Sequence, residues 1–589
     1  MPVEKLITDH IDIWSSALQT RSTAGRGSNG KIDLYGIKKL RELILELAVR
    51  GKLVPQDSND EPASELLKRI AKERDELVKS KVIRKPKALG KIEITNTPFD
   101  LPDGWEWCYL NDIGDWGAGA TPSRSNSKYY NGDIPWFKSG ELSSDFISDS
   151  EEKITEFALQ ECSLRENKVG DVLIAMYGAT IGKTSILNVR GTTNQAVCAC
   201  TPYSGISNIY LLTLLKAYKR IFIGMGAGGA QPNISREKLI ATVFALPPKA
   251  EQNRIICKVD ELMSLCEHLE QESLTSLDAH QQLVETLLTT LTDSQSADEL
   301  AENWARISQH FDTLFTTEAS IDVLKQTILQ LAVMGKLVPQ DPSDEPASEL
   351  LKRIEQEKAQ LVKEGKIKKQ KPLPPVSDDE KPFELPMGWE WCRIGEIIAN
   401  MDAGWSPACS PEPSPNEDIW GVLKTTAVQS LEYREQENKT LPNSKLPRPQ
   451  YEVHDGDILV TRAGPKNRVG VSCLVEKTRS KLMISDKIIR FHLISDDISA
   501  KYISLCLNRG VTADYLEASK SGMAESQMNI SQENLRSAPI ALPPTEIQLK
   551  VISTIEDFFK VCDQLKSRLQ SAQQTQLHLA DALTDAALN

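Results

Sequence analysis

The sequence contains two copies of one unit, and this duplication restricts the folds that the chain can adopt. Residues 51–57 read Gly-Lys-Leu-Val-Pro-Gln-Asp, and residues 335–341 repeat them letter for letter. Residues 61–70 recur as residues 345–354 at the same offset of 284. Because each copy must form the same structural unit, we expect two equivalent halves rather than a series of unrelated domains.

Shorter matches continue through each copy, but the stretches between them diverge. Residues 101–108 read Leu-Pro-Asp-Gly-Trp-Glu-Trp-Cys, and residues 385–392 differ from them at one position. In contrast, residues 121–130 have no counterpart in the Pro- and Glu-rich residues 406–418. Nearly identical flanks around dissimilar interiors indicate that the flanks perform one task twice, whereas the interiors perform two different tasks.

The flanks have the periodicity of helices. An apolar stripe at i, i+3, i+4 and i+7 ends at Gly51, as expected for an amphipathic helix. A second stripe follows each Leu-Pro-Pro sequence and recurs at an offset of 296, which predicts long helices that pack on other helices. The first stripe is Leu40, Leu43, Ile44 and Leu47; the second is Ile256, Val259, Met263 and Cys266, repeated as Ile552, Ile555, Phe559 and Cys562.

The interiors alternate short apolar runs with loops rich in Gly, Pro and Asn, which is typical of mixed α/β domains. The repeated Gly-Trp-Glu-Trp sequences that open them are interpreted as core anchors in preference to base-stacking platforms. The basic residues 79–91 and 363–371 are interpreted as flexible linkers in preference to DNA contacts. We predict an α+β chain with five segments: residues 1–99, helical with a basic linker; 100–249, a first α/β domain; 250–383, helical with a linker; 384–544, a second α/β domain; and 545–589, a helix.

Composition is that of a water-soluble protein with reduced cysteines. Of the 589 residues, 40% are hydrophobic and 26% are charged, and no apolar run approaches the ~20 residues of a membrane helix. The N-terminus shows no secretory signal, and the eleven cysteines are scattered, as in proteins of reducing compartments. We expect a cytoplasmic protein with no membrane partner and, lacking a C-x-x-C pair, no zinc site.

The net charge of −13 is unevenly distributed along the chain. Residues 251–383 carry 14 basic and 25 acidic side chains, whereas residues 100–250 and 384–544 have net charges of −2 and −3. DNA affinity rests largely on neutralisation of phosphates by Lys and Arg. A near-neutral domain can still present a basic face, but it would bind DNA weakly alone and would need basic partners.

Two glycine-rich segments resemble nucleotide-binding loops but miss their defining context. Residues 178–184 have three residues between the two glycines, where a phosphate-cradling loop needs four. Residues 224–229 fit Gly-x-Gly-x-x-Gly, but Pro232 follows where a helix should form. The chain also lacks the Asn/Asp-Pro-Pro-Tyr/Phe motif that holds a flipped adenine in amino-methyltransferases. We therefore expect no catalytic residues and no metal ligands.

The combination of motifs resembles the specificity subunits (HsdS) of Type I restriction-modification enzymes. The resemblance covers nearly the whole chain, and the long repeats resemble those of the IB group typified by EcoAI. It rests on residues 101–107, 119–123, 131–136 and 170–174, and on the Asn-Ile-Ser and Leu-Pro-Pro sequences of each copy.

This resemblance implies two target recognition domains that are separated by long antiparallel conserved helices, related by a pseudo-twofold axis. Each domain would read one half of a bipartite site in double-stranded DNA, while the duplicated helices dock two modification subunits and fix the half-site spacing. Adenine methylation, cleavage and translocation would belong to the two modification and two restriction subunits, which bind S-adenosylmethionine, ATP and Mg²⁺. The chain itself would hold no cofactor. A stand-alone DNA methyltransferase and a purely structural scaffold are the alternatives.

Within the two domains we expect side chains that contact phosphates and base edges. Arg and Asn suit guanine and adenine because they form two hydrogen bonds with one base, whereas Lys suits phosphate. The candidates in the first domain are Thr121, Ser123, Arg124, Lys128, Lys138 and Lys183; those in the second are Lys424, Thr425, Thr426, Arg462, Lys466, Asn467 and Arg468.

Overall fold

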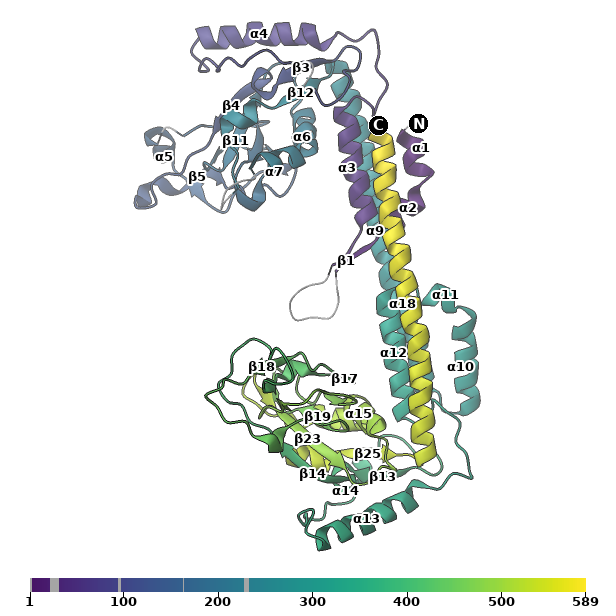
Figure 1. Cartoon of the computed structure of the whole chain (residues 1–589). Coiled ribbons are helices and arrows are strands. Elements are labelled where there is room, and N and C mark those ends of the chain that lie inside the picture. Colours follow the sequence, from purple (N-terminus) through teal and green to yellow (C-terminus); the bar gives the residue numbers. More distant parts are fainter. Residues whose placement is uncertain (1–2, 22–30, 94–96, 163, 227–231, 589) are drawn as a thin grey trace. The chain divides into compact units, whose positions relative to one another are not determined.

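The computed structural model divides the chain into two compact units, each described here by itself (Figure 1). It describes residues 3–21, 31–93, 97–162, 164–226 and 232–588. Unit 1 comprises residues 1–277 and 571–589, and unit 2 comprises residues 278–570. The predicted five-segment division remains a proposal, and the units cut across it because two long helices each contribute to both units. These helices are α9 (Lys249–Asp293) and α18 (Thr545–Leu588).

In unit 1, α3 (Tyr35–Val49) packs against the beginning of α9 and the end of α18. Arg41 and Gln56 contact Glu270 and Glu251 at 2.7 and 3.1 Å, so α3 is antiparallel to α9. Lys39 contacts Asp581 at 2.9 Å, and Lys52 contacts the Leu588 carbonyl at 2.7 Å, so α3 is parallel to α18. The long helices are therefore antiparallel within this unit. The predicted α3 stripe, Leu40, Leu43, Ile44 and Leu47, is buried.

Unit 2 repeats this arrangement around α12 (Glu318–Val333). Lys325 contacts Asp563 at 2.5 Å and Glu318 contacts Lys566 at 3.2 Å, so α12 is antiparallel to α18. Lys336 donates to the Thr292 carbonyl at 2.7 Å, near the end of α9. Each unit is thus completed by the end of the long helix that begins in the other unit.

The buried seam of the long helices differs by one position from part of the predicted stripe. Ile255 and Leu262 are buried, whereas their neighbours Ile256 and Met263 are only partly buried. The core positions follow a 4-3-4-3 spacing, which is the heptad pattern of packed helices. Because both neighbours are apolar, periodicity could not distinguish them. The seam is Ile255, Val259, Leu262, Cys266 and Leu269 in α9, and Val551, Ile555, Phe558, Cys562 and Leu565 in α18, where Phe558 and Leu565 are partly buried.

The first predicted α/β domain, residues 100–249, is called domain 1, and the second, residues 384–544, is called domain 2. Domain 1 is built on a five-stranded sheet of order β4-β11-β8-β9-β6 and a three-stranded sheet of order β10-β5-β7. A separate pair, β3 and β12, closes its two ends together. The strands are β3 (Glu106–Tyr109), β4 (Gly114–Ala118), β5 (Tyr130–Phe137), β6 (Phe146–Ile147), β7 (Lys153–Ile154), β8 (Val172–Ala175), β9 (Thr184–Leu187), β10 (Thr192–Thr193), β11 (Val197–Pro202) and β12 (Val243–Leu246). The helices are α5 (Glu156–Glu161), α6 (Asn208–Ala217), α7 (Lys219–Gly226) and α8 (Arg236–Ile240).

Domain 2 has the matching order β14-β23-β19-β21 in its larger sheet and β18-β15-β22 in its smaller one, and β13 pairs with β25. Its strands are β13 (Glu390–Arg393), β14 (Ile398–Ala403), β15 (Gly421–Leu423), β16 (Val428–Gln429), β17 (Glu432–Tyr433), β18 (Asn438–Thr440), β19 (Ile458–Thr461), β20 (Ala463–Gly464), β21 (Ser472–Leu474), β22 (Leu482–Met483), β23 (Ile488–Leu493), β24 (Met528–Asn529) and β25 (Pro539–Leu542). Its helices are α14 (Ile394–Ile397), α15 (Ala500–Asn508), α16 (Gly510–Ala518) and α17 (Gln532–Ser537).

The remaining elements flank these domains. They are α1 (Val3–Thr8), α2 (Ile11–Ser16), β1 (Gln19–Arg21), β2 (Lys31–Asp33) and α4 (Ala63–Lys79) in unit 1, and α10 (Ala297–Gln309), α11 (Phe311–Leu314) and α13 (Ala347–Lys363) in unit 2. Within the described ranges, no helix is both long enough and apolar enough to cross a membrane.

The Gly-Trp-Glu-Trp segments join each domain to its helices. Trp105 is 4% exposed and Trp389 is 6% exposed, which confirms them as core anchors. The Trp105 indole donates to Glu251 at 3.0 Å, and the Trp389 indole donates to Gln340 at 2.8 Å. Polar indole groups usually find such a partner when the ring is buried.

The linker before domain 2 is packed against that domain. Arg393, at the end of β13, donates to the Pro374 carbonyl at 2.7 Å and the Pro375 carbonyl at 3.0 Å. It also pairs with Glu380 at 2.7 Å, and the Arg393 guanidinium holds the pKa of Glu380 at about 2. This contact lies beyond residues 363–371, for which flexibility was predicted; residues 374–380 are held to the domain because an arginine of the domain binds their backbone and Glu380.

Candidate nucleic-acid interface

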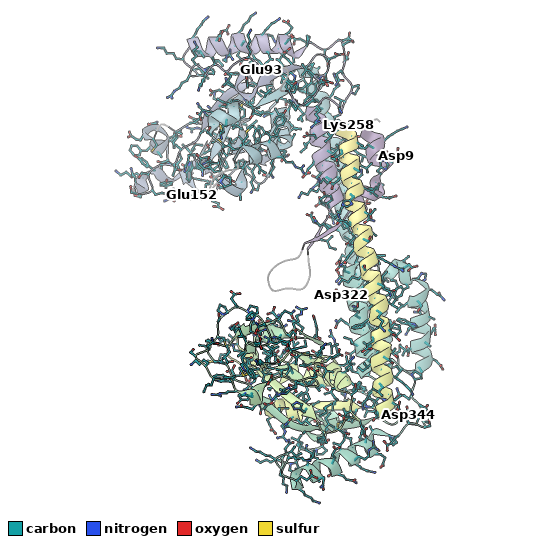
Figure 2. All side chains as sticks on the ribbon, viewed as in Figure 1. Asp9, Glu93, Glu152, Lys258, Asp322 and Asp344 are labelled. Atoms are coloured by element: carbon teal, nitrogen blue, oxygen red, sulfur yellow. The ribbon has the colours of Figure 1, made fainter. Side chains whose placement is uncertain are left out.

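Each domain carries a lysine and a glutamate at the same place in its smaller sheet. Lys138 directly follows β5 and Lys424 directly follows β15, while Glu152 and Glu437 directly precede the neighbouring strands β7 and β18. The Lys138 ammonium lies 2.6 Å from Glu152, and the Lys424 ammonium lies 3.8 Å from Glu437 (Glu152 is labelled in Figure 2). The duplication therefore preserves an ion pair at this sheet edge.

In domain 1 an arginine joins this ion pair. Arg124, on the loop after β4, donates to Glu152 at 3.2 Å through one nitrogen and pairs with it through another. Its guanidinium lies 4.8 Å from the Tyr130 ring centroid and 5.2 Å from that of Trp136. Arg124 and Lys138 lower the pKa of Glu152 to about 2. The aromatic rings and the carboxylate thus hold an exposed arginine in one orientation.

Domain 2 places an arginine over an aromatic ring by a different route. The loops after β4 and β14 begin alike, because the Ala120 amide donates to the Thr193 carbonyl at 3.0 Å and the Trp405 amide donates to the Ile484 carbonyl at 3.1 Å. The guanidinium of Arg448 lies 4.2 Å from the Trp405 ring centroid. The sequence did not predict Arg448, because it lies far from Trp405 in the chain and belongs to no repeated motif. The position of Trp405 in a predicted loop was the available indication in the sequence that an arginine could stack here.

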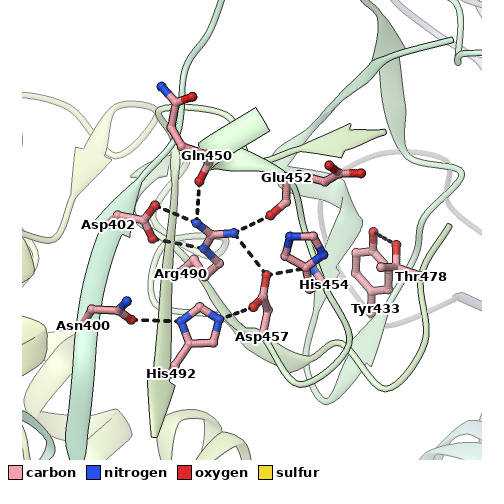
Figure 3. Close-up of polar contacts among 10 residues, drawn as sticks. All are labelled: Asn400, Asp402, Tyr433, Gln450, Glu452, His454, Asp457, Thr478, Arg490 and His492. Atoms are coloured by element: carbon pink, nitrogen blue, oxygen red, sulfur yellow. Dashed lines mark hydrogen bonds and ion pairs between the residues drawn. The ribbon is translucent and has the colours of Figure 1, made fainter. Parts of the chain in front are cut away.

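The larger sheet of domain 2 contains a buried polar network (Figure 3). Asp457 is fully buried, accepts from the His454 amide at 3.0 Å and lies 2.5 Å from His492 Nε2. Arg490 contacts Asp457 at 3.4 Å and Asp402 at 2.8 Å. The second ring nitrogen of His492 contacts the Asn400 amide oxygen at 2.9 Å, so the imidazole is held between two neighbours rather than beside a hydroxyl or thiol. The network joins β14, β23 and the turn before β19. It contains a buried aspartate–imidazole pair, but one ring nitrogen faces Asp457 and the other faces Asn400, which leaves neither for the nucleophile of a catalytic triad.

Domain 1 also places an arginine beside its larger sheet, but this arginine, Arg165, comes from a different segment than Arg490 does in domain 2. Asp171 corresponds to Asp457, accepts from the Lys168 amide at 3.0 Å, and has its pKa raised by burial. Arg165 donates to Asp115 at 2.7 Å and to Thr201 at 3.0 Å. A Cβ on Gly117 would lie 2.6 Å from this guanidinium, so glycine leaves the room that Arg165 occupies.

Comparison with known proteins places this geometry in a family. A family profile described as "Type I restriction modification DNA specificity domain" matches residues 102–279 and 386–573. The Type I restriction enzyme EcoEI specificity subunit of Escherichia coli is 72% identical over the full length of both chains, and the EcoAI specificity subunit of Escherichia coli is 46% identical, also over both full lengths. The chain belongs to the Type I restriction enzyme specificity subunits.

The predicted resemblance is confirmed, including the relation to the IB group. A crystal structure of the HsdS subunit from Thermoanaerobacter tengcongensis is 16% identical, covering 84% of this chain and 99% of that one with a TM-score of 0.41. Specificity subunits are non-catalytic and work in complexes whose other subunits carry the enzymatic activities. The reading of the chain as a stand-alone methyltransferase is therefore rejected.

The structure of this specificity subunit also shows why the glycine-rich residues 178–184 do not form a phosphate-binding loop. Gly178–Thr180 form a short 3-10 turn, and β9 begins at Thr184. A phosphate-binding loop would lead into a helix whose N-terminus faces the phosphate. In the second segment, residues 224–226 end α7, and residues 227–231 lie outside the described residues. Across the described part of the chain, no group of three or more His, Cys, Asp or Glu side chains could hold a metal ion.

Some of the predicted DNA-contacting side chains are exposed, whereas others already form hydrogen bonds within their own domain. Arg468 belongs to the second group, because it donates to the Thr425 and Val428 carbonyls at 2.8 and 2.6 Å and to Gln429 at 2.8 Å. Burial lowers the pKa of Arg468. This arginine braces the loop that carries Thr425 and Thr426, and Thr426 donates to Glu437 at 2.6 Å.

The other candidates lie on loops, except Lys128, which lies in a short 3-10 helix (Ser127–Tyr129). In domain 1, Thr121 bonds Gln195, Ser123 bonds Ser125 at 2.8 Å, Lys128 is exposed, and Lys183 is 3.5 Å from the Gly140 carbonyl. In domain 2, Arg462 is half-buried, Lys466 is 3.6 Å from Glu525, and Asn467 is exposed. Their contact with DNA stays a prediction.

Replacing Glu152 with glutamine should loosen Arg124 and remove the nearer of the two carboxylates that neutralise Lys138. We expect tighter binding to nonspecific DNA and a salt slope steeper by roughly one unit, with poorer discrimination at one half-site because the guanidinium is no longer fixed. Fluorescence anisotropy with specific and nonspecific duplexes at several salt concentrations measures both effects.

The matched control is Glu151→Gln, which removes the same charge. Glu151 is 77% exposed and lies 3.5 Å from Lys138, and this substitution leaves the pairing of Arg124 with Glu152 intact. It should change the salt slope alone. If both substitutions reduced discrimination equally, the fixed orientation of Arg124 would have no role in specificity.

Proposed function

We propose that each recognition domain reads one half of a bipartite site in double-stranded DNA, while the duplicated helices dock two modification subunits and fix the half-site spacing. One observation carries this proposal. The two domains share a sheet and a lysine–glutamate pair, yet each builds its arginine–aromatic contact from different segments: Arg124 on Tyr130 and Trp136 in one, Arg448 on Trp405 in the other. Two domains that share one sheet arrangement but expose arginines from different segments are suited to two half-sites of different sequence.

The same comparison suggests separate roles for the side chains. Lys138 and Lys424 occupy equivalent places, and a contact that is the same in both domains suits the phosphate backbone, which is the same in every sequence. Arg124 and Arg448 differ in origin, and arginine forms paired hydrogen bonds with guanine. We assign the lysines to phosphate positioning and the two arginines to base edges.

The proposed partners supply the chemistry. Two modification subunits would transfer methyl groups from S-adenosylmethionine to adenine, which they reach by flipping the base out of the duplex. Two restriction subunits would use ATP and Mg²⁺ for translocation and cleavage. The near-neutral recognition domains fit this arrangement, because basic surfaces of partner subunits would add to the DNA affinity. We place the complex in the cytoplasm, where such partners and DNA meet.

Single substitutions in the reconstituted complex test this assignment. Arg124→Ala should cost about 1–3 kcal/mol of discrimination at one base pair of its own half-site, and Arg448→Ala should do the same at the other half-site. Lys138→Ala and Lys424→Ala should weaken binding to all sequences alike and reduce the salt slope by roughly one unit. Competition binding against single-base variants of each half-site measures these effects.

Two results would count against the proposal. A uniform loss of affinity from both arginine substitutions would make them phosphate contacts rather than base readers. A complex that binds all DNA sequences equally would favour the purely structural scaffold instead.

A further inference from the structure

The chain between β18 and β19 carries a leucine that the fold leaves uncovered. Leu446 is 87% exposed and lies directly after Lys445 and two residues before Arg448. We call residues 442–450 the proline loop. The surrounding residues 438–451 contain three cations and no carboxylate, although domain 2 as a whole has a net charge of −3. A cationic loop with an exposed apolar side chain is therefore part of a near-neutral domain.

The contacts of the proline loop hold it in one conformation. Its prolines, whose rings fix the backbone angle φ, are Pro442, Pro447 and Pro449. The Lys445 amide donates to the carbonyl of residue 442 at 2.9 Å, and the Arg448 amide donates to Met483 Sδ at 3.4 Å. The Gln450 carbonyl accepts from Arg490 at 2.9 Å (Figure 3). Because the loop is already ordered, binding through it costs little conformational entropy.

Leu446 lies beside the side chain that the proposed function assigns to base reading. The Arg448 guanidinium lies 4.2 Å from the Trp405 ring centroid. Two residues span at most roughly 7 Å of chain, so the backbone of Leu446 lies within that distance of the Arg448 backbone. Successive bases of one DNA strand are about 3.4 Å apart along the helix axis. Leu446 therefore lies within a few base pairs of the base that Arg448 reads.

Domain 1 has a different structure at the corresponding place. After β7, the Thr155 amide donates to the Tyr129 carbonyl at 3.1 Å. After β18, the Leu441 amide donates to the Trp420 carbonyl at 2.9 Å, so the two connections begin alike. Domain 1 then forms α5, whose exposed side chains include two glutamates. Because carboxylates repel phosphates, a role of this connection on DNA is confined to domain 2.

The composition of the proline loop fits DNA better than a protein partner. Lys445 and Arg448 carry charges of one sign, which suits the phosphates of a polyanion, whereas lysine is depleted in protein–protein interfaces. An apolar side chain between such cations gains most burial by entering the stacked bases. Proteins that bend DNA insert leucine and similar side chains between base steps in this way. Leu446 has the same chemistry in the same kind of setting.

We propose that Leu446 enters the base stack of the half-site read by domain 2 and partly unstacks one base-pair step, while Lys445 contacts a neighbouring phosphate. We call this role of Leu446 the wedge. It rests on the proposed function, because Arg448 brings the proline loop to the DNA. Unstacking bends the duplex and lowers the cost of extruding a base. Domain 2 thereby distorts the DNA on which the modification subunit acts, whereas domain 1 only reads it.

Fluorescence energy transfer across each half-site tests the wedge in the complex with modification subunits. One dye lies in the spacer and the other lies beyond one half-site, so each duplex reports the bend at one half. The unaltered complex should bend the half-site of domain 2 by about 20–90° and that of domain 1 less. Leu446→Ala should abolish the larger bend and weaken specific binding roughly tenfold, because it removes an apolar side chain that becomes buried.

The controls separate a wedge from a general DNA contact. Leu446→Met keeps the apolar bulk and should retain the bend, whereas Leu446→Asn, which is polar and similar in size, should lose it. Lys445→Ala should weaken binding to all sequences alike, reduce the salt slope by roughly one unit and leave the bend unchanged. Met387→Ala removes another exposed apolar side chain, outside the proline loop, and should change neither the bend nor the affinity.

Three results would overturn the wedge: an unaltered complex that leaves the half-site of domain 2 straight, an unchanged bend with Leu446→Ala, or an unchanged bend with Leu446→Asn. Weaker binding with an unchanged bend would make Leu446 a groove contact, such as one to a thymine methyl group. Arg448→Ala tests the proposed function separately. If it left discrimination at both half-sites unaltered, the proposed function would fail; if it reduced discrimination while the bend was independent of Leu446, the wedge alone would fail.

Discussion

Replacing residues 101–248 with the corresponding domain of the EcoAI specificity subunit should change one half of the recognised DNA site and leave the other half as it was. The exchanged segment begins and ends at structurally matched points, because β3 and β12 pair with each other at the two ends of domain 1. All contacts of Arg124 with Glu152, Tyr130 and Trp136 lie inside the segment. The change in specificity should be complete for that half, because every candidate base contact of domain 1 is replaced.

Sequencing of methylated DNA from the reconstituted complex measures the outcome directly. A reciprocal exchange of residues 385–544 is the control, and it should alter the opposite half alone. If either exchange changed both halves, or neither, the assignment of one domain to one half-site would be wrong.

Replacing Asp457 with alanine should lower the free energy of unfolding of unit 2 by about 3–5 kcal/mol, the usual cost of removing one partner from a buried ion pair. The carboxylate is fully buried and faces Arg490 and His492. Asp402 would still neutralise Arg490 in part, but the His454 amide would lose its acceptor. The side-chain link between the start of β19 and β23 would then be lost, while the backbone pairing of the two strands would remain.

Urea denaturation followed by hydrogen exchange can locate this loss in unit 2. Asp455→Ala is the control, since Asp455 is exposed and accepts from the Thr478 amide at 2.9 Å; it should cost little. Asp171→Ala in unit 1 should cost less than Asp457→Ala, because Arg165 donates to Asp115 rather than to Asp171. An Asp457→Ala variant as stable as the Asp455→Ala control would show that the network adds nothing to the stability of unit 2.

The duplication made the fold largely predictable from the sequence. Because the segments that flank the two domains are nearly identical in sequence, they had to form the same helices. The pattern of Leu40, Leu43 and Ile44 identified α3 correctly. Periodicity failed where two apolar residues are adjacent, as at Ile255 and Ile256, because a seam can use either neighbour. Only packing against a particular partner helix decides between them.

The candidate interface was less predictable, because it depends on contacts between distant loops. Arg468 lies in a basic loop and resembles a base reader in sequence, yet three carbonyl and amide oxygens of the domain accept its hydrogen bonds. Arg448 was overlooked, yet it lies over Trp405. A single sequence shows the residue type but not whether the fold already satisfies its donors.

The exchange of helix ends between the units has a consequence for the order of events during synthesis. Tyr35 and Lys39 of α3 contact Asp581, and Ala580 is fully buried in the core of unit 1. These contacts must wait while residues 278–570 are translated, which takes roughly 15–60 s at ~5–20 residues per second. Until α18 emerges from the ribosome, the apolar flank of α3 and α9 stays uncovered. The first half of this protein can therefore finish folding only after the second half has been made.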